Sequence, residues 1–207
     1  MNQQGRFGRA TWWLALPALV LLGVGEVPAQ AWIAGATAGI AKQYDYEVGG
    51  TISDSDDSDI AYRAFGGYLF KPTFGVLLSW VDLGGASYEG PAFGGFTDEL
   101  DADGIDLSVL GGWAPGSQDL FRLFGTVGVF WWSQDVHYTD ASGVYNYDDS
   151  GSSLSIAAGG EFGLGSSAHW GVHFEWARFF DVGDQNNSGH EYDRDMVSLG
   201  FEYRFGK

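Results

Sequence analysis

Apolar and polar residues alternate with a period of two along several segments of the chain, which predicts β-strands with one apolar face and one small or charged face. The segment near the C-terminus shows this pattern most simply. Its apolar face would carry Val197, Leu199, Phe201, Tyr203 and Phe205. Its other face would carry Ser198, Gly200, Glu202 and Arg204. Helical periodicity is missing, and no stretch after Trp32 is apolar over the length of a membrane-spanning helix.

Segments of this kind recur along the whole chain. They predict eight strands, at 32–41, 59–70, 74–83, 104–113, 120–136, 153–164, 169–181 and 193–205. Short connections are expected at 71–73, 114–119 and 165–168, and long polar loops at 42–58, 84–103, 137–152 and 182–192. Short turns at one end and long loops at the other are typical of barrels that cross an outer membrane. The sequence therefore predicts an all-β fold, an eight-stranded antiparallel up-and-down transmembrane β-barrel.

A secreted β-sandwich or a lipocalin-like barrel is the rival all-β interpretation, with its apolar face turned inward. Two features favour the membrane barrel. The polar face is rich in Gly, Ala and Ser beside isolated charges, as a narrow lumen requires, whereas a face in water would carry more Lys, Glu and Thr. The apolar face also ends in aromatic residues, as in interfacial girdles. These are Trp113, Trp131, Trp170, Tyr203 and Phe205.

The N-terminal segment has the organisation of a secretory signal peptide. Arg6 and Arg9 precede an uncharged apolar stretch at 12–24, and small residues follow. A membrane-spanning helix is the alternative, but it needs about 20 apolar residues. We therefore expect a signal peptide at 1–31 and an exported barrel domain at 32–207.

The chain is strongly acidic, with 10 Lys and Arg against 27 Asp and Glu and a net charge of −17. Such a surface repels nucleic acids, so no nucleic-acid partner is expected. The absence of Cys excludes disulfides and thiolate metal sites. The 9 Trp, 10 Tyr and 15 Phe are unusual beside so much charge. A barrel resolves this contrast by turning aromatic residues to lipid and placing acids in the outer loops.

Three segments resemble the OmpA-type transmembrane domain, an eight-stranded outer-membrane barrel family. Trp32–Gly39 is similar to the family's W-x-x-G-A-x-x-G opening, and Ala64–Gly75 to its A-F-G-G-Y-x-x-N-P-x-x-G hairpin. Ser198–Phe205 resembles its closing strand of alternating aromatics. The resemblance implies the outer membrane of a Gram-negative bacterium, and recognition of 193–205 by the barrel-assembly machinery. With the chain ending at Lys207, a barrel without the family's peptidoglycan-binding domain is expected.

Five ionisable residues are predicted to share the lumen, because each lies on the inward face of the last three strands. They are Glu161, His173, Glu175, Glu202 and Arg204. Unpaired charges in a narrow lumen would cost several kcal/mol each, so these groups should pair, with Arg204 beside Glu202 or Glu161. Either they form a structural network or they form a gate. The resemblance implies a lumenal Arg gate in which His173 takes the Arg position, Glu161 is retained and Leu77 replaces an acid.

Catalytic and metal sites are the weaker interpretations. Lipid A modification would need Ser, His and an acid together, and His137 and His190 lie only in acidic, Ser-rich loops. A Ca²⁺-binding run is the other candidate, but it lacks the Gly and the terminal Glu of an EF-hand loop. It comprises Asp54, Asp56, Asp57 and Asp59. A solvated face is the usual meaning of such a run, with weak divalent bridging to lipopolysaccharide as the alternative.

These observations predict a monomer with a structural role that maintains the envelope and presents surface loops. Outer-membrane lipids and lipopolysaccharide are the expected partners, and no cofactor is expected. A small gated porin that passes ions or very small solutes is the alternative function. A lipid A-modifying enzyme is the less favoured one.

Overall fold

The β-strands account for nearly all of the residues that the computed structural model describes, which are 31–44, 54–91, 95–114, 120–164, 169–184 and 190–205. The strands are β1 (Ala31–Tyr44), β2 (Asp54–Asp56), β3 (Ser58–Lys71), β4 (Phe74–Gly90), β5 (Phe96–Trp113), β6 (Phe121–Asp140), β7 (Gly143–Leu164), β8 (Trp170–Asp184) and β9 (His190–Phe205). No helix in these ranges is long and apolar enough to span a membrane. The predicted signal peptide, 1–31, lies outside the described residues except for Ala31, which begins β1.

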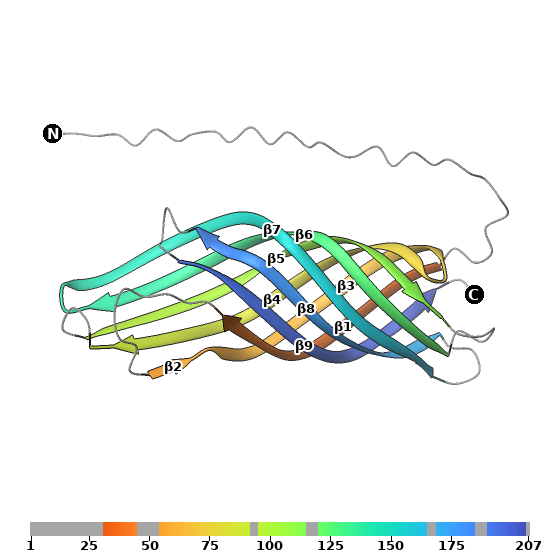
Figure 1. Ribbon diagram of the computed structural model, residues 1–207, viewed down its shortest axis with the longest axis horizontal. Helices are drawn as coiled ribbons and strands as arrows, with labels where there is room; N and C mark the ends of the chain where they lie inside the picture. The colour runs from red at the N-terminus through yellow and green to blue at the C-terminus, as the bar shows by residue number, and fades with distance from the viewer. Residues whose placement is uncertain are drawn as a thin grey trace, which may run out of the picture.

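Antiparallel pairing closes the sheet into a barrel (Figure 1). Every strand from β3 to β8 pairs with the next, and β1 pairs with both β3 and β9. Trp32 is thereby opposite Tyr68 on one side and Phe205 on the other. The barrel consists of β1 and β3–β9, while β2 is a short addition along the outer part of β4. The predicted eight-stranded antiparallel barrel is confirmed.

The outer face of the barrel carries a band of exposed large apolar side chains. They include Trp32, Ile40, Leu78, Trp80, Leu107, Trp113, Val127, Trp131, Leu154, Phe162, Trp170, Leu199 and Phe205. Water would penalise such a surface, but hydrocarbon would not. Aromatic contacts gather near the short-turn end, where Tyr203 packs against Trp170 at a ring-centroid distance of 4.9 Å and against Phe205 at 4.7 Å. The band has the composition and girdle of a lipid-facing surface.

Most of the predicted loop at 84–103 and almost all of that at 137–152 is strand, so the expected loop lengths are wrong. The β6–β7 hairpin runs in continuous register from Phe121↔Phe162 to Asp140↔Gly143, with only Ala141 and Ser142 between the strands. In the outer part of β7, both strand faces are exposed and apolar alternation is lost, whereas the β4–β5 extension keeps a buried inward face beside an acidic outer face. The hydrogen-bonded ladder nevertheless continues, and in Figure 1 the β6–β7 hairpin projects farther than β8 and β9.

The ladder between β7 and β8 is shorter than its neighbours. It covers only the register from Leu164↔Trp170 to Ser155↔Phe179. An irregularity in the β8–β9 ladder lies between Phe179 and Val182, and it contains Asp181 at φ 48°. Such bulges bend a strand and increase its twist. Beyond this point β8 continues along β9 and not along β7.

Candidate functional site in the barrel lumen

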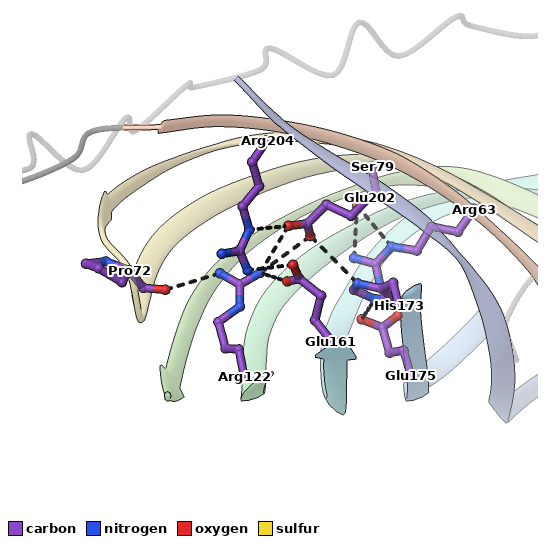
Figure 2. Close-up of polar contacts among 9 residues, drawn as sticks. All are labelled: Arg63, Pro72, Ser79, Arg122, Glu161, His173, Glu175, Glu202 and Arg204. Atoms are coloured by element: carbon purple, nitrogen blue, oxygen red, sulfur yellow. Dashed lines mark hydrogen bonds and ion pairs between the residues drawn. The ribbon is translucent and has the colours of Figure 1, made fainter. Parts of the chain in front are cut away.

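The five predicted lumen residues all lie inside the barrel with exposures of 4% or less. Glu161 comes from β7, His173 and Glu175 from β8, and Glu202 and Arg204 from β9. Because side chains of a strand alternate between faces, residues two apart on β8 and β9 point the same way. Figure 2 shows them in a row along the lumen, together with further residues that complete the network.

Arg122, Glu161, Glu202 and Arg204 form one ion-pair group, here called the proximal group. Glu161 lies between the two guanidiniums, with Oε2 2.6 Å from Arg122 Nη2 and Oε1 2.5 Å from Arg204 Nη2. Glu202 repeats the arrangement at 3.4 Å from Arg122 Nη2 and 3.1 Å from Arg204 Nε. Arg122 Nη1 also donates to the Pro72 carbonyl oxygen of the β3–β4 turn at 3.3 Å. Two buried charges of each sign therefore neutralise one another.

A second cluster, here called the central group, is built around Arg63 of β3. Its guanidinium pairs with Glu175 of β8 and with Asp106 of β5, the latter at 3.3 Å. Ser79 of β4 accepts from Arg63 Nε at 3.0 Å and from Nη2 at 2.9 Å. Ser155 of β7 donates to Asp106. The central group thus crosses the lumen between opposite walls of the barrel.

His173 lies between the two groups. Its Nε2 is 3.7 Å from Glu175 Oε2, and its Nδ1 is 3.8 Å from Glu202 Oε2. Phe65 and Phe124 pack on the imidazole with ring-centroid distances of 5.0 and 4.9 Å. Aromatic faces accommodate a cation as well as a neutral ring. The site therefore holds the histidine between two carboxylates and two phenylalanines.

Sequence reasoning missed Arg63, Arg122 and Asp106. Each lies on the inward face of its strand, and this parity was the available signal: Arg122 alternates with lipid-facing Leu123, and Arg63 with Tyr62. With them, the two groups contain three guanidiniums and four carboxylates, beside the one imidazole. The charged atoms of the network are directed at one another. Chemically the arrangement neutralises charge and fills space.

An apolar layer occupies the lumen beyond the central group, on the side of the long hairpins. It consists of Val81, Leu83, Leu100, Phe130, Phe179 and Met196, all with exposures of 1% or less. Phe130 and Phe179 meet at a ring-centroid distance of 4.6 Å. The expectation that the inward face is only small or charged is therefore wrong for this half of the barrel. Large apolar side chains point inward here because the lumen must be filled where no ion pairs reach.

Arg194 of β9 closes the far side of the apolar layer. Nη1 donates to the carbonyl oxygens of Leu83 at 3.1 Å and Gly84 at 2.7 Å. Nη2 donates to the Leu100 carbonyl oxygen at 3.3 Å and to Gln43 Oε1 at 3.1 Å. Carbonyl oxygens are available to it because the β4–β5 ladder is irregular here, with Gly84 at φ 64°. A single side chain thereby ties together β1, β4, β5 and β9.

The acidic run at the N-terminal end of β3 does not assemble a metal site. Asp57 pairs with Lys42 at 3.4 Å, and Asp59 accepts from the Gly85 amide at 2.9 Å. Asp54 and Asp56 lie on β2. Within the ranges that the structure describes, no group of three or more His, Asp or Glu side chains is arranged to hold a metal ion.

A closed eight-stranded barrel with an apolar outer band and a polar network inside defines an outer-membrane β-barrel protein. Residues 28–207 match the family model described as OmpA-like transmembrane domain. The chain belongs to this family, as its motifs indicated, and the predicted outer-membrane localisation in a Gram-negative bacterium is confirmed.

Relatives and solved structures agree with this assignment. Outer membrane protein A of Escherichia coli O157:H7 is 28% identical over 177 residues, covering 85% of this chain and 48% of the relative. That of Shigella flexneri is 27% identical, covering 85% and 49%. The chain thus spans about half the length of these relatives. Neisserial surface protein A shares the fold with a TM-score of 0.55 at 13% identity, covering 84% of this chain and 99% of the other. A major outer membrane protein from Thermus thermophilus gives a TM-score of 0.53 at 15% identity, covering 86% and 100%.

Proposed function

We propose that this barrel is a structural, non-conducting component of the outer membrane that carries an extended β-sheet on the cell surface. The main support is that two different layers of side chains fill the lumen, one polar and one apolar. The ion-paired groups cross it first, and the apolar layer then fills it with side chains exposed by 1% or less. In this class the short turns face the periplasm, so the long β4–β5 and β6–β7 hairpins face outward.

Single-channel recording of the refolded full chain in planar bilayers tests this function. We expect no steady conductance, because an ion would have to displace both the ion-paired groups and the apolar layer. Steady conductance of the unmodified protein would contradict the proposal. Heat-modifiable migration of the same preparation provides the folding control, since a closed barrel migrates differently before and after heating.

A small gated porin is the second candidate, favoured by the position of His173 between the two ion-pair groups. Protonation of an imidazole there would change the partners of Glu175 and Glu202. Under this alternative, Glu161→Ala and His173→Ala would alter a measurable conductance, whereas Glu99→Ala on the outer face would not. The apolar layer argues against it, because loosening the ion pairs leaves Phe130 and Phe179 in place.

A lipid A-modifying activity has less support from the described histidines. His169 Nδ1 lies 3.0 Å from the carbonyl oxygen of Arg204, and His173 is enclosed in the lumen. His137 lies on the outer face of β6 without a serine in its cross-strand positions, which are Glu99 and Asn146. An altered lipid A mass spectrum from overexpressing cells would contradict the non-enzymatic proposal.

The apolar band would contact outer-membrane lipids, and the acidic outer part would lie at the height of lipopolysaccharide phosphates. The barrel-assembly machinery would recognise residues 193–205 of the closing strand β9. A monomer is expected because every barrel strand is already paired on both sides within the membrane band.

A further inference from the structure

The outer part of β7 is an open sheet edge. Gly143–Asp148 pairs with β6 in unbroken register, but the ladder to β8 begins only at Ser155. No other strand among the described residues joins this segment, here called the β7 edge. Its six residues extend over roughly 20 Å. In an antiparallel ladder every second residue directs its N–H and C=O away from its partner, so the β7 edge presents a row of backbone donors and acceptors.

The opposite border of the same projecting sheet is covered. There β2, three residues long, pairs with β4 through Asp54↔Glu89, Ser55↔Tyr88 and Asp56↔Ser87. A short acidic strand is one of the devices by which proteins protect a sheet border from unwanted pairing. The β7 edge has no such cover in the described structure, and it contains no Lys, Pro or bulge. The two borders of one sheet thus differ in whether they accept another strand.

The two faces beside the β7 edge differ in chemistry. On one face Asp101, Asp135 and Asp148 are cross-strand neighbours in a row that ends at the edge. Like charges in such positions repel. Burial and the neighbouring carboxylates of Asp59 and Asp135 raise the pKa of Asp101, against the opposing effect of Arg194.

The other face carries an aromatic row that ends at the same edge. Phe96 stacks on Tyr138 at a ring-centroid distance of 6.1 Å, and Tyr138 lies 6.2 Å from Tyr145. Tyr145 and Tyr147 remain 40% and 39% exposed. A strand laid beside β7 would therefore meet carboxylates with one set of alternate side chains and tyrosines with the other.

We propose that the β7 edge binds an extended basic peptide by β-strand addition, with Arg or Lys side chains facing Asp148 and alternate apolar or aromatic side chains facing Tyr145 and Tyr147. Backbone hydrogen bonds would supply affinity, and the two rows would supply specificity. A second copy fits less well. In two chains inserted into the membrane in the same orientation, the two β7 strands run in the same direction, so their edges could pair only as parallel strands. Both edges would also bring the carboxylate of Asp148, and these like charges would repel.

A pair of synthetic peptides tests backbone pairing separately from charge. The probe is a ten-residue peptide of alternating Arg and Val, and its control has the same sequence with alternate amides N-methylated, which removes hydrogen-bond donors but keeps the charge. Binding is measured by fluorescence anisotropy on the refolded full chain in phosphatidylcholine vesicles. We expect saturable binding that weakens at least tenfold for the N-methylated peptide. Equal binding of the two peptides, or none of either, would overturn the proposal.

Two charge variants locate the binding. Asp148→Lys at the β7 edge should weaken peptide binding at least tenfold, whereas Asp103→Lys, in the acidic part of β5 away from the edge, should change it less than threefold. Amide hydrogen exchange at 143–148 should slow when the peptide is bound. Equal losses in both variants would mean diffuse electrostatic attraction, and a dimer without peptide would mean that the second copy is the partner; either result overturns the proposal.

This inference shares with the proposed function only the outward orientation of the long hairpins. Conductance does not depend on the β7 edge, and peptide binding does not depend on the lumen. A conducting barrel that still binds the peptide would refute the first proposal alone. A silent barrel that ignores the peptide would refute the second alone.

Discussion

Glu161 and His173 are direct cross-strand partners on β7 and β8, yet each makes its ion-pair contacts with other side chains. Glu161 reaches Arg122 and Arg204, while His173 faces Glu175 and Glu202. Neighbouring positions in the sheet thus belong to different parts of the network. Ion pairs in the lumen therefore join strands across the barrel, and not only strands that are neighbours in the sheet.

Removing one carboxylate from the proximal group should be costly. Glu161→Ala leaves Arg122 and Arg204 with only Glu202 between them, and breaking a buried ion pair in this way costs about 3–5 kcal/mol. Urea unfolding of the refolded protein in lipid vesicles measures the loss. Glu99→Ala on the exposed outer face is the matched control, with an expected effect of about 0.5 kcal/mol or less. An unchanged unfolding midpoint in Glu161→Ala would show that the pairing does not stabilise the barrel.

The apolar layer should depend on its aromatic side chains. Phe130→Ala opens a cavity against Phe179, and a buried Phe→Ala change typically costs about 3–5 kcal/mol. Val127→Ala, on the lipid-facing side of the same strand, removes exposed apolar surface and leaves no cavity. Its smaller effect in the same urea experiment provides the comparison. Equal effects of the two substitutions would mean that the layer is not tightly packed.

Gly35 should not accept a side chain. A Cβ there would collide with the Phe65 ring and with the Phe201 carbonyl oxygen at 2.5 Å, and backbone cannot move aside as a flexible side chain can. Gly35→Ala should therefore destabilise the folded barrel, by an amount typical of overpacking, about 1–3 kcal/mol. Gly111→Ala is the control, because a Cβ there meets nothing within 4 Å. The fraction of heat-modifiable protein after refolding reports the difference, and equal fractions would contradict the prediction.

The acidic row outside the membrane band should make stability depend on pH. The pKa of Asp101 is raised, chiefly by burial and then by Asp59 and Asp135. The folded state therefore binds this proton more tightly than the unfolded state. Protonated Asp101 therefore contributes to the stability of the folded state at pH values below its unfolded pKa, which is about 3.9. This contribution is lost as the pH rises through the pKa of the folded state.

Asp101→Asn should accordingly raise stability at pH 7. It should also flatten the decrease in stability with increasing pH that begins above about pH 4. Glu99→Gln removes the same charge two residues along the strand and is the control. Urea midpoints measured between about pH 4 and pH 8 distinguish the two variants. A decline of the same steepness in Asp101→Asn would rule out Asp101 as its source.

The barrel itself was predictable because lipid contact imposes a strict rule on alternate residues. Leu199 and Phe201 must be apolar where they face hydrocarbon, and Glu202 and Arg204 beyond them had to point inward. The five residues that the same logic assigned to the inward face are all buried in the structure. It failed for the outer strand extensions, such as 143–152, because no lipid imposes alternation there and hydrogen-bond ladders leave no comparable mark in the sequence.

The apolar layer was not predictable for a different reason. On β6 the inward residues Phe124 and Phe130 are as apolar as the outward residues Val127 and Val129, so composition cannot tell the two faces apart. Arg122 was overlooked for the same cause, since it begins a strand that is apolar on both sides. Its alternation with lipid-facing Leu123 indicates the inward face, and the register with β7, which puts Arg122 opposite Glu161, shows that it is inside.

The last strand supplies half of the proximal group. Glu202 and Arg204 lie close to the end of β9, whereas Arg122 and Glu161 come from β6 and β7. Until β9 pairs with β1, Glu161 has only one of its two guanidiniums and Arg122 only one of its two carboxylates. Because β9 brings one carboxylate and one guanidinium, the proximal group would keep its charge balance without the sixteen residues of β9, but of its ion pairs only that between Arg122 and Glu161 would remain.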